Sequence, residues 1–141
     1  MSTTTASKKA ATDLYQSHDH CLMDELLTEE HRLIRDTARK HVSTHLKPII
    51  EERFEKGTFS HDIIPGLAEI GAFGPMVPVE YGGMGLDQIS YGLIMQEIER
   101  CDSGLRSLCS VQGSLVMYPI WKYGSEEQKK KWLPQLAAGT R

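Results

Sequence analysis

The sequence of 141 residues lacks several features that would assign it to a specialised class of protein. Its three cysteines are an odd number without CxxC spacing, which argues against a disulfide framework or a zinc site and favours free thiols in a reducing compartment. Basic residues do not exceed acidic ones and the net charge is -3, so nucleic acid and anionic membrane are not expected partners. No apolar run approaches the ~20 residues of a membrane helix, and no N-terminal segment resembles a signal peptide.

Strict alternation of polar and apolar residues, which would indicate half-buried strands, is also missing. Apolar residues instead recur every three or four positions, as on one face of a helix. Hydrophobic residues make up 40% and charged residues 25% of the chain, which is an ordinary balance for one globular domain. We therefore predict an all-α fold, a bundle of about six helices.

The N-terminal residues 1–26 differ in composition from the rest of the chain. They open with small polar residues and show no apolar period, so we predict a flexible tail followed by one helical domain over residues 27–141. Three aspartates in the tail, Asp13, Asp19 and Asp24, argue against a mitochondrial presequence, which is poor in acidic residues. We thus expect a cytoplasmic protein without a signal or transit peptide.

Caps and helix breakers set the boundaries of the predicted helices. Thr28 and Ser60 resemble N-caps, and Ser125 with Gln128 three residues later forms a capping box. Three prolines should end, kink or interrupt helices: Pro48, Pro119 and Pro134. The expected helices cover about residues 28–46, 49–56, 60–70, 87–101, 105–118 and 125–138.

Helical spacing also predicts which side chains face the core. The inward residues of the first and fourth helices are expected to be Leu33, Ile34, Ala38, Val42, Leu46, Ile89, Leu93, Ile94, Ile98 and Cys101. The fifth helix is apolar on all sides, which predicts burial against several neighbours. Between the third and fourth helices, the glycines of residues 73–85 show no phosphate-binding pattern and favour a chain reversal that needs positive φ angles.

Two groups of histidines invite a metal-site interpretation. The run from His18 to Cys21 contains metal-ligand residue types but lies in the predicted tail, without a second ligand pair at a usual spacing. His41 and His45 stand one helical turn apart and form only half of a ligand set. We therefore predict no metal site. The basic run of residues 129–131 is interpreted as a solvated helix face.

The segment of residues 97–110 contains the candidate functional site. Asp102-Ser103-Gly104 is a helix stop followed at once by a helix start, with Ser103 as the expected N-cap. Arg106 then falls in the first turn of the next helix, and Ser110 follows one turn later on the same face. A cation opposes the helix dipole there unless an anion lies nearby. That anion is Asp102, Glu99 or the carboxylate of a ligand.

Several motifs of the chain resemble the N-terminal helical domain of acyl-CoA dehydrogenases. They are LTEE at residues 27–30, YGGMG at 81–85, YGSEEQ at 123–128 and LPQLAAGT at 133–140. Within that family, ERCDSGLRS at 99–107 and SVQGSLVM at 110–117 most resemble glutaryl-CoA dehydrogenase. Leu105, Gly113 and Tyr118 depart from that pattern.

This resemblance implies an enzyme that oxidises glutaryl-CoA with FAD and decarboxylates the product to crotonyl-CoA. Arg106, Ser107, Ser110 and Glu99 match the positions that surround the free carboxylate of the substrate. The family also implies a homotetramer that passes electrons to an electron-transfer flavoprotein or another acceptor.

The family further implies a β-domain and a C-terminal bundle, which hold the main FAD site and the catalytic glutamate. Neither is part of this chain, so we expect no catalytic residue here and an inactive N-terminal part of the enzyme. The alternative is a stand-alone helical binding module that kept the fold and lost the chemistry. Reading the gene beyond Arg141 separates the two.

Overall fold

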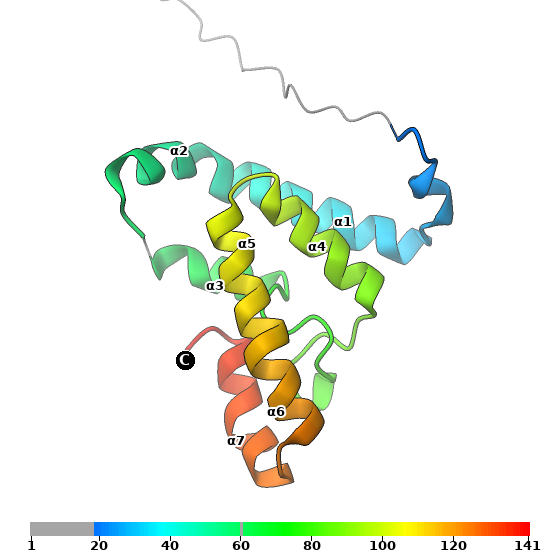
Figure 1. Cartoon of the computed structure of the whole chain (residues 1–141), viewed down its shortest axis with the longest axis vertical. Helices are drawn as coiled ribbons and strands as arrows, with labels where there is room; N and C mark the ends of the chain where they lie inside the picture. Colours follow the sequence, from blue (N-terminus) through cyan, green and yellow to red (C-terminus); the bar gives the residue numbers. More distant parts are fainter. Residues whose placement is uncertain (1–18, 60) are drawn as a thin grey trace, which may run out of the picture.

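A computed structural model describes residues 19–59 and 61–141 (Figure 1). Every regular element in these residues is helical, which confirms the predicted all-α fold. The α-helices are α1 (Glu29–His41), α2 (Lys47–Lys56), α3 (Ile64–Glu69), α4 (Gln88–Glu99), α5 (Ser103–Ser110), α6 (Tyr118–Tyr123) and α7 (Glu126–Ala137). Short 3-10 turns cover Met23–Leu26, His61–Ile63 and Val79–Tyr81, and π-helical segments cover Val42–Leu46 and Val111–Met117. Ser60, the expected cap of the third helix, and most of the predicted tail lie outside the described residues.

The predicted start of the first helix is confirmed in atomic detail. The Thr28 hydroxyl accepts a hydrogen bond from the backbone N–H of His31 at 3.2 Å, and the His31 ring accepts one from the N–H of Thr28 at 3.3 Å. Gly57 closes α2 at a φ of 59°, a conformation that glycine adopts without steric cost.

The three prolines disturb the helices less than expected. Pro48 and Pro119 lie in the first turns of α2 and α6, directly after the π-helical segments, and the helical path continues through both prolines. The predicted interruption at Pro134 is wrong, because α7 continues past it to Ala137. Leu133 and Leu136, which flank Pro134, are both buried, so tertiary packing outweighs the lost hydrogen bond.

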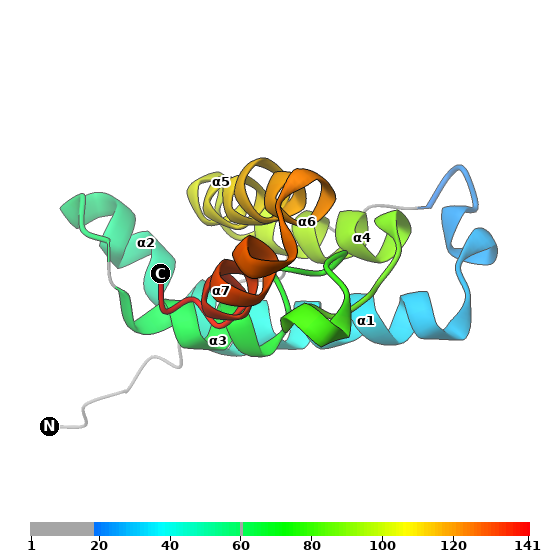
Figure 2. The same ribbon diagram turned by 90° about the horizontal axis from the view of Figure 1, so that it is seen from below.

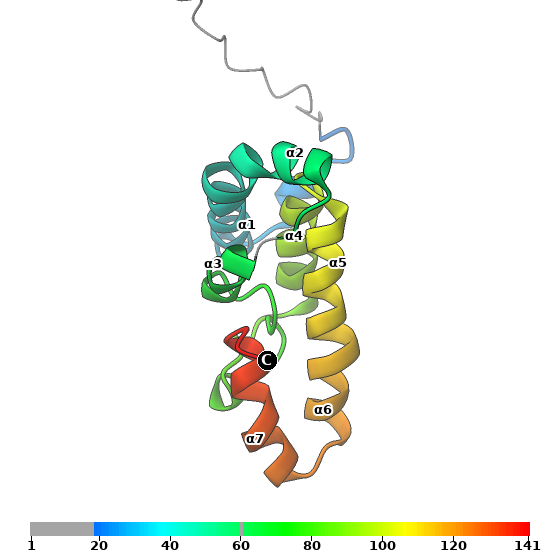
Figure 3. The same cartoon turned by 90° about the vertical axis from the view of Figure 1, so that its left-hand side faces the viewer.

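Two helical layers form the body of the protein. Helix α1 lies along α4, and α4 turns into the long helical path of α5, the second π-helical segment and α6 (Figures 1 and 3). Helix α7 returns alongside α6, and Figure 2 shows α1 and α3 on the side opposite α5. The most deeply buried large side chains are Phe73, Leu46, Leu67, Ile94, Ile98, Met117 and Leu133.

Two residues predicted to face the core are exposed instead. Leu33 on α1 is 68% exposed and Ile89 on α4 is 51% exposed. The rest of the predicted stripe does face inward, since Ala38, Val42 and Leu46 are buried and Ile34 packs against the core, and His31 rather than Leu33 continues it. Burial here is decided by where α4 lies against α1, which helical period alone does not specify.

The loop between α3 and α4 reverses the chain as predicted. Gly82 and Gly85 have φ angles of 84° and 65°. A Cβ on Gly83 would lie 2.0 Å from the carbonyl oxygen of Val77, so only glycine allows the chain to close on itself there. The Tyr81 hydroxyl donates to Glu126 at 2.7 Å and ties this loop to α7.

Candidate functional site

Helix α5 begins one residue earlier than the sequence indicates. Asp102, and not Ser103, is the N-cap: its carboxylate accepts a hydrogen bond from the N–H of Leu105 at 2.8 Å. Leu105 lies three residues after Asp102, which is the distance over which an N-cap side chain bonds a backbone amide. Ser103 is therefore the first residue of α5, and Arg106 lies at the end of its first turn.

Arg106 and Glu99 form an ion pair across this junction. The Nε of Arg106 donates to Oε2 of Glu99 at 2.5 Å. Its Nη1 also donates to the hydroxyl of Ser110, with a long distance of 3.4 Å. The expected grouping of an arginine with a hydroxyl one turn later is confirmed, and Glu99 is the protein anion that answers the Arg106 charge.

The ion pair shifts the titration of both partners. The hydrogen bond from Arg106, followed by one from Ser103, lowers the pKa of Glu99 below its ordinary value. The same contact with Glu99 raises the pKa of Arg106. Glu99 is therefore ionised and Arg106 cationic at neutral pH, so the two side chains carry opposite charges.

Arg106 keeps most of its hydrogen-bonding capacity. A guanidinium has five N–H donors, and the contacts with Glu99 and Ser110 occupy two of them. Among the described residues, Nη2 has no acceptor, and the Arg106 side chain is 37% exposed. The Nη1–Nη2 edge is thus open to a planar anion such as a carboxylate, which accepts two parallel hydrogen bonds.

The serines predicted for the site differ in their contacts. The hydroxyl of Ser110 also donates to the carbonyl oxygen of Ser107 at 3.1 Å. Ser107 enters the described network only through that carbonyl. Sequence reasoning missed the role of Ser103, whose hydroxyl donates to Oε1 of Glu99 at 2.5 Å. Ser103 lies four residues after Glu99, a spacing that indicates such a contact, but the interpretation of Ser103 as the N-cap concealed it.

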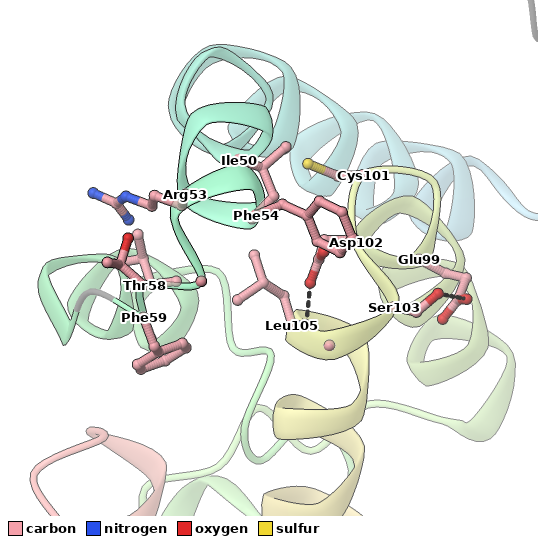
Figure 4. Close-up of a pocket in the computed structure, with 13 residues that line it drawn as sticks. Ile50, Arg53, Phe54, Thr58, Phe59, Glu99, Cys101, Asp102, Ser103 and Leu105 are labelled. Carbon is pink, nitrogen blue, oxygen red and sulfur yellow. Dashed lines mark hydrogen bonds between the residues drawn. The ribbon is translucent and has the colours of Figure 1, made fainter.

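A pocket of about 760 Å³ opens beside the junction (Figure 4). Glu99, Ser103 and Leu105 line one side of it, and Phe54 and Phe59 line the side formed by the end of α2 and the following loop. Both aromatic rings are exposed. The Glu99–Ser103 contact therefore lies at the edge of a partly apolar cavity.

Glu97, two residues before Glu99, has a structural position. It is 3% exposed, and its two carboxylate oxygens accept hydrogen bonds from Nε and Nη2 of Arg39 at 3.1 and 2.8 Å. Arg100 approaches the same carboxylate at 3.5 Å. Glu97 thus joins α4 to α1, whereas Glu99 points to α5, as their different helical directions predict.

The histidine pair has the geometry of a ring contact. The His41 and His45 ring centroids lie 4.8 Å apart. Within residues 19–59 and 61–141, no group of three or more histidine, cysteine, aspartate or glutamate side chains is arranged to hold a metal ion. His18, the first member of the other candidate cluster, lies outside the described residues. None of the helices in the described part of the chain is long and apolar enough to cross a membrane.

Comparison with known structures points to one family. A crystal structure of glutaryl-CoA dehydrogenase from Mycobacterium smegmatis, in complex with FADH2, matches with a TM-score of 0.81 and 45% sequence identity. The match covers 85% of this chain and 31% of that one. The described helices therefore form the same arrangement as part of that enzyme.

Sequence relatives agree with this result. The chain is 37% identical to a protein of Bacillus subtilis named as a probable acyl-CoA dehydrogenase, over 89% of this chain and 21% of the relative. It is 36% identical to a 3-(aryl)acrylate reductase of Clostridium sporogenes, over 81% of this chain and 30% of the relative. The chain thus spans less than a third of the length of these relatives.

The family profile described as acyl-CoA dehydrogenase, N-terminal domain, matches residues 28–140. This range includes the glycine loop, the junction of α4 and α5, and helix α7. The chain belongs to the acyl-CoA dehydrogenase family, of which it represents the N-terminal helical domain.

Proposed function

We propose that this chain is the substrate-selecting N-terminal part of an FAD-dependent glutaryl-CoA dehydrogenase. The observation that carries the proposal is the open Nη1–Nη2 edge of Arg106 beside its ion pair with Glu99. An acyl-CoA with a second carboxylate at its far end offers the matching acceptor, and an uncharged acyl chain does not. The similarity to the glutaryl-CoA dehydrogenase of Mycobacterium smegmatis supports this choice of substrate.

Each predicted site residue has a distinct part in this proposal. Arg106 binds the far carboxylate through its free donors. Glu99 holds the guanidinium by Nε, so that the opposite edge faces the substrate. Ser110 supports Nη1, and Ser107, at the next position of the same helix turn, supplies a further hydroxyl. These residues bind and orient the substrate, and none of them is proposed to break a bond.

The main FAD site is proposed to lie outside this chain. The glycine loop has no phosphate-binding pattern, and the carbonyl of Val77 fills the space beside Gly83. We therefore place FAD and the proton-abstracting glutamate on segments that the longer relatives possess. The chain alone is then inactive, and an electron-transfer flavoprotein as acceptor, a tetrameric assembly and a cytoplasmic location stay predictions.

Substitution of Arg106 in the complete enzyme tests the proposal. Arg106→Ala is expected to lower kcat/KM for glutaryl-CoA about 100-fold, since two charge-assisted hydrogen bonds are lost. Turnover of butyryl-CoA, which lacks the second carboxylate, should change only a few-fold. Arg106→Lys should recover part of the loss, because lysine keeps the charge but not the planar pair of donors.

Arg32→Ala, at the far end of α1, is the matched control for removal of an arginine side chain. It should leave the preference for glutaryl-CoA over butyryl-CoA unchanged. Equal losses on both substrates in Arg106→Ala would mean that Arg106 is a structural residue, and the proposed substrate would be wrong.

A further inference from the structure

The hydroxyl of Ser103 is available for a role at the site because Asp102 caps α5. The hydroxyl oxygen of an N-cap serine accepts a hydrogen bond from a backbone amide of the first turn. Here the Asp102 carboxylate already holds the N–H of Leu105. Ser103 instead donates its hydroxyl proton to Oε1 of Glu99 at 2.5 Å, as the dashed line in Figure 4 shows.

The two oxygens of Glu99 therefore have different donors. Oε1 accepts from Ser103 and Oε2 accepts from Nε of Arg106, each at 2.5 Å. A carboxylate beside an arginine ordinarily takes two parallel hydrogen bonds from the guanidinium. In this structure, the second oxygen of Glu99 is turned to Ser103, so Glu99 makes one bond to Arg106 and leaves Nη2 without an acceptor among the described residues.

Helix geometry places the participating side chains on one face of α5. Ser103, Arg106 and Ser110 are separated by three and four residues, the spacings that bring side chains together on a helix. Glu99 reaches this face from the end of α4. Without the Ser103 hydroxyl, the three side-chain torsions of Glu99 are restrained by Arg106 alone.

We propose that Ser103 is a positioning residue for substrate selection, which restricts Glu99 to a single hydrogen bond with Nε of Arg106 and keeps the guanidinium available to a carboxylate ligand. This inference rests on the proposed function of Arg106. In the absence of the hydroxyl, Glu99 turns its second oxygen to Nη2, takes one of its two protons and neutralises the guanidinium charge more fully, which weakens its attraction for the substrate carboxylate. Ser103 thus increases affinity for a carboxylate ligand without touching it.

The rearrangement can be measured on the chain itself by NMR of the arginine side-chain nitrogens. In the native chain, only the Nε–H of Arg106 should be protected from exchange by Glu99. In Ser103→Ala, the Nη2 protons should also become protected and the pKa of Glu99 should change. Ser103→Thr, which restores a hydroxyl, should return the native spectrum. Unchanged Arg106 signals in Ser103→Ala would overturn the proposal.

Kinetics of the complete, FAD-loaded enzyme supply the functional test. Ser103→Ala should raise KM for glutaryl-CoA about 3- to 10-fold, the worth of one hydrogen bond, with kcat nearly unchanged. KM for butyryl-CoA should stay constant, and Ser103→Thr should recover the native values. Ser43→Ala, an exposed serine in the first π-helical segment, is the matched control and should have no effect.

Comparison with Arg106→Ala separates the two proposals. If Arg106→Ala abolishes the preference for glutaryl-CoA and Ser103→Ala does not alter it, the role of Ser103 is wrong and that of Arg106 stands. If Arg106→Ala leaves the preference intact, the proposed substrate is wrong and the inference about Ser103 falls with it. An equal rise of KM for both substrates in Ser103→Ala would indicate a general structural effect and would also refute the inference.

Discussion

Two glutamates at the end of α4, two residues apart, show how much the direction of one side chain decides. Glu97 points into the contact between α4 and α1 and is buried, while Glu99 points to α5 and remains partly exposed. The buried carboxylate depends on Arg39 for both of its close hydrogen bonds. Arg39, in contrast, is 45% exposed and can reach water when its partner is absent. Glu97 would therefore lose the close partner of a buried charge, whereas Arg39 would lose a partner that water can replace.

This asymmetry predicts that Arg39→Ala destabilises the fold more than Glu97→Ala does. Removal of Arg39 leaves a buried charge with only a distant contact to Arg100, at a cost of about 3–5 kcal/mol in the free energy of unfolding. Removal of Glu97 leaves arginines that solvent can hydrate. Urea denaturation of both variants measures the difference.

The double variant with both alanines should be more stable than Arg39→Ala alone, because it contains no buried charge. Glu55→Ala, an exposed glutamate on α2, should change stability by less than about 0.5 kcal/mol. A smaller loss in Arg39→Ala than in Glu97→Ala would contradict this account of the pair.

At the scale of the elements, the N-terminal ends of α1 and α4 are fastened to each other by a histidine and an aspartate. The Nδ1 of His31 accepts from the N–H of Thr28, so Nε2 carries the proton of the neutral ring and donates to Oδ2 of Asp87 at 2.9 Å. The other oxygen of Asp87 caps α4 by accepting from the N–H of Ser90 at 2.8 Å. Asp87 thus caps the start of α4 and holds α1 against it.

These contacts predict a loss of stability in acid. The hydrogen bonds from the backbone of Ser90 and from His31 lower the pKa of Asp87 from 3.8 to about 2. Because the folded-state pKa is the lower one, the stabilisation is present above about pH 4 and is lost as the pH falls toward 2. Thermal unfolding followed by circular dichroism across this range measures the effect.

Asp87→Asn keeps an oxygen for the cap but places an amide donor against the Nε2 proton of His31. It should cost about 1 kcal/mol at pH 7 and reduce the loss of stability between pH 4 and pH 2. Asp102→Asn, which likewise retains a cap but faces no histidine, is the matched control and should alter stability little. An unchanged acid profile in Asp87→Asn would show that this contact is not responsible.

On the scale of the whole molecule, the path from α5 to α6 presents apolar side chains on two sides. Cys109 and Met117 are completely buried, whereas Val111 is 47% and Leu115 is 69% exposed. The all-round apolar composition predicted burial on several sides, and the described residues cover only one. The exposed side is therefore available surface on this domain when it is studied alone.

We expect the 141-residue chain to bind a hydrophobic dye at this surface. Val111→Thr combined with Leu115→Ser should remove most of the fluorescence enhancement without loss of helicity, because neither residue belongs to the core. Leu26→Ser, an equally exposed leucine near α1, should leave most of the signal. Similar signals from native protein and the double variant would place dye binding elsewhere.

The sequence by itself determined what depends on neighbours along the chain. Thr28 and Ser125 as caps, Gly57 as a helix stop and the proximity of Arg106 to Ser110 follow from the fixed rise and rotation of a helix. The resemblance of several motifs to acyl-CoA dehydrogenases identified the family, which the comparisons confirm.

Only the tertiary structure decided what depends on contacts between elements. Leu33 and Ile89 have the spacing of core residues, yet no helix among the described residues covers them. Pro134 is tolerated because Leu133 and Leu136 of α7 remain buried. The choice of Glu99 as the partner of Arg106, and of Ser103 as the partner of Glu99, depends on the angle between α4 and α5. Local spacing determines which side chains share a helix face, whereas their burial and pairing depend on which other elements pack against that face.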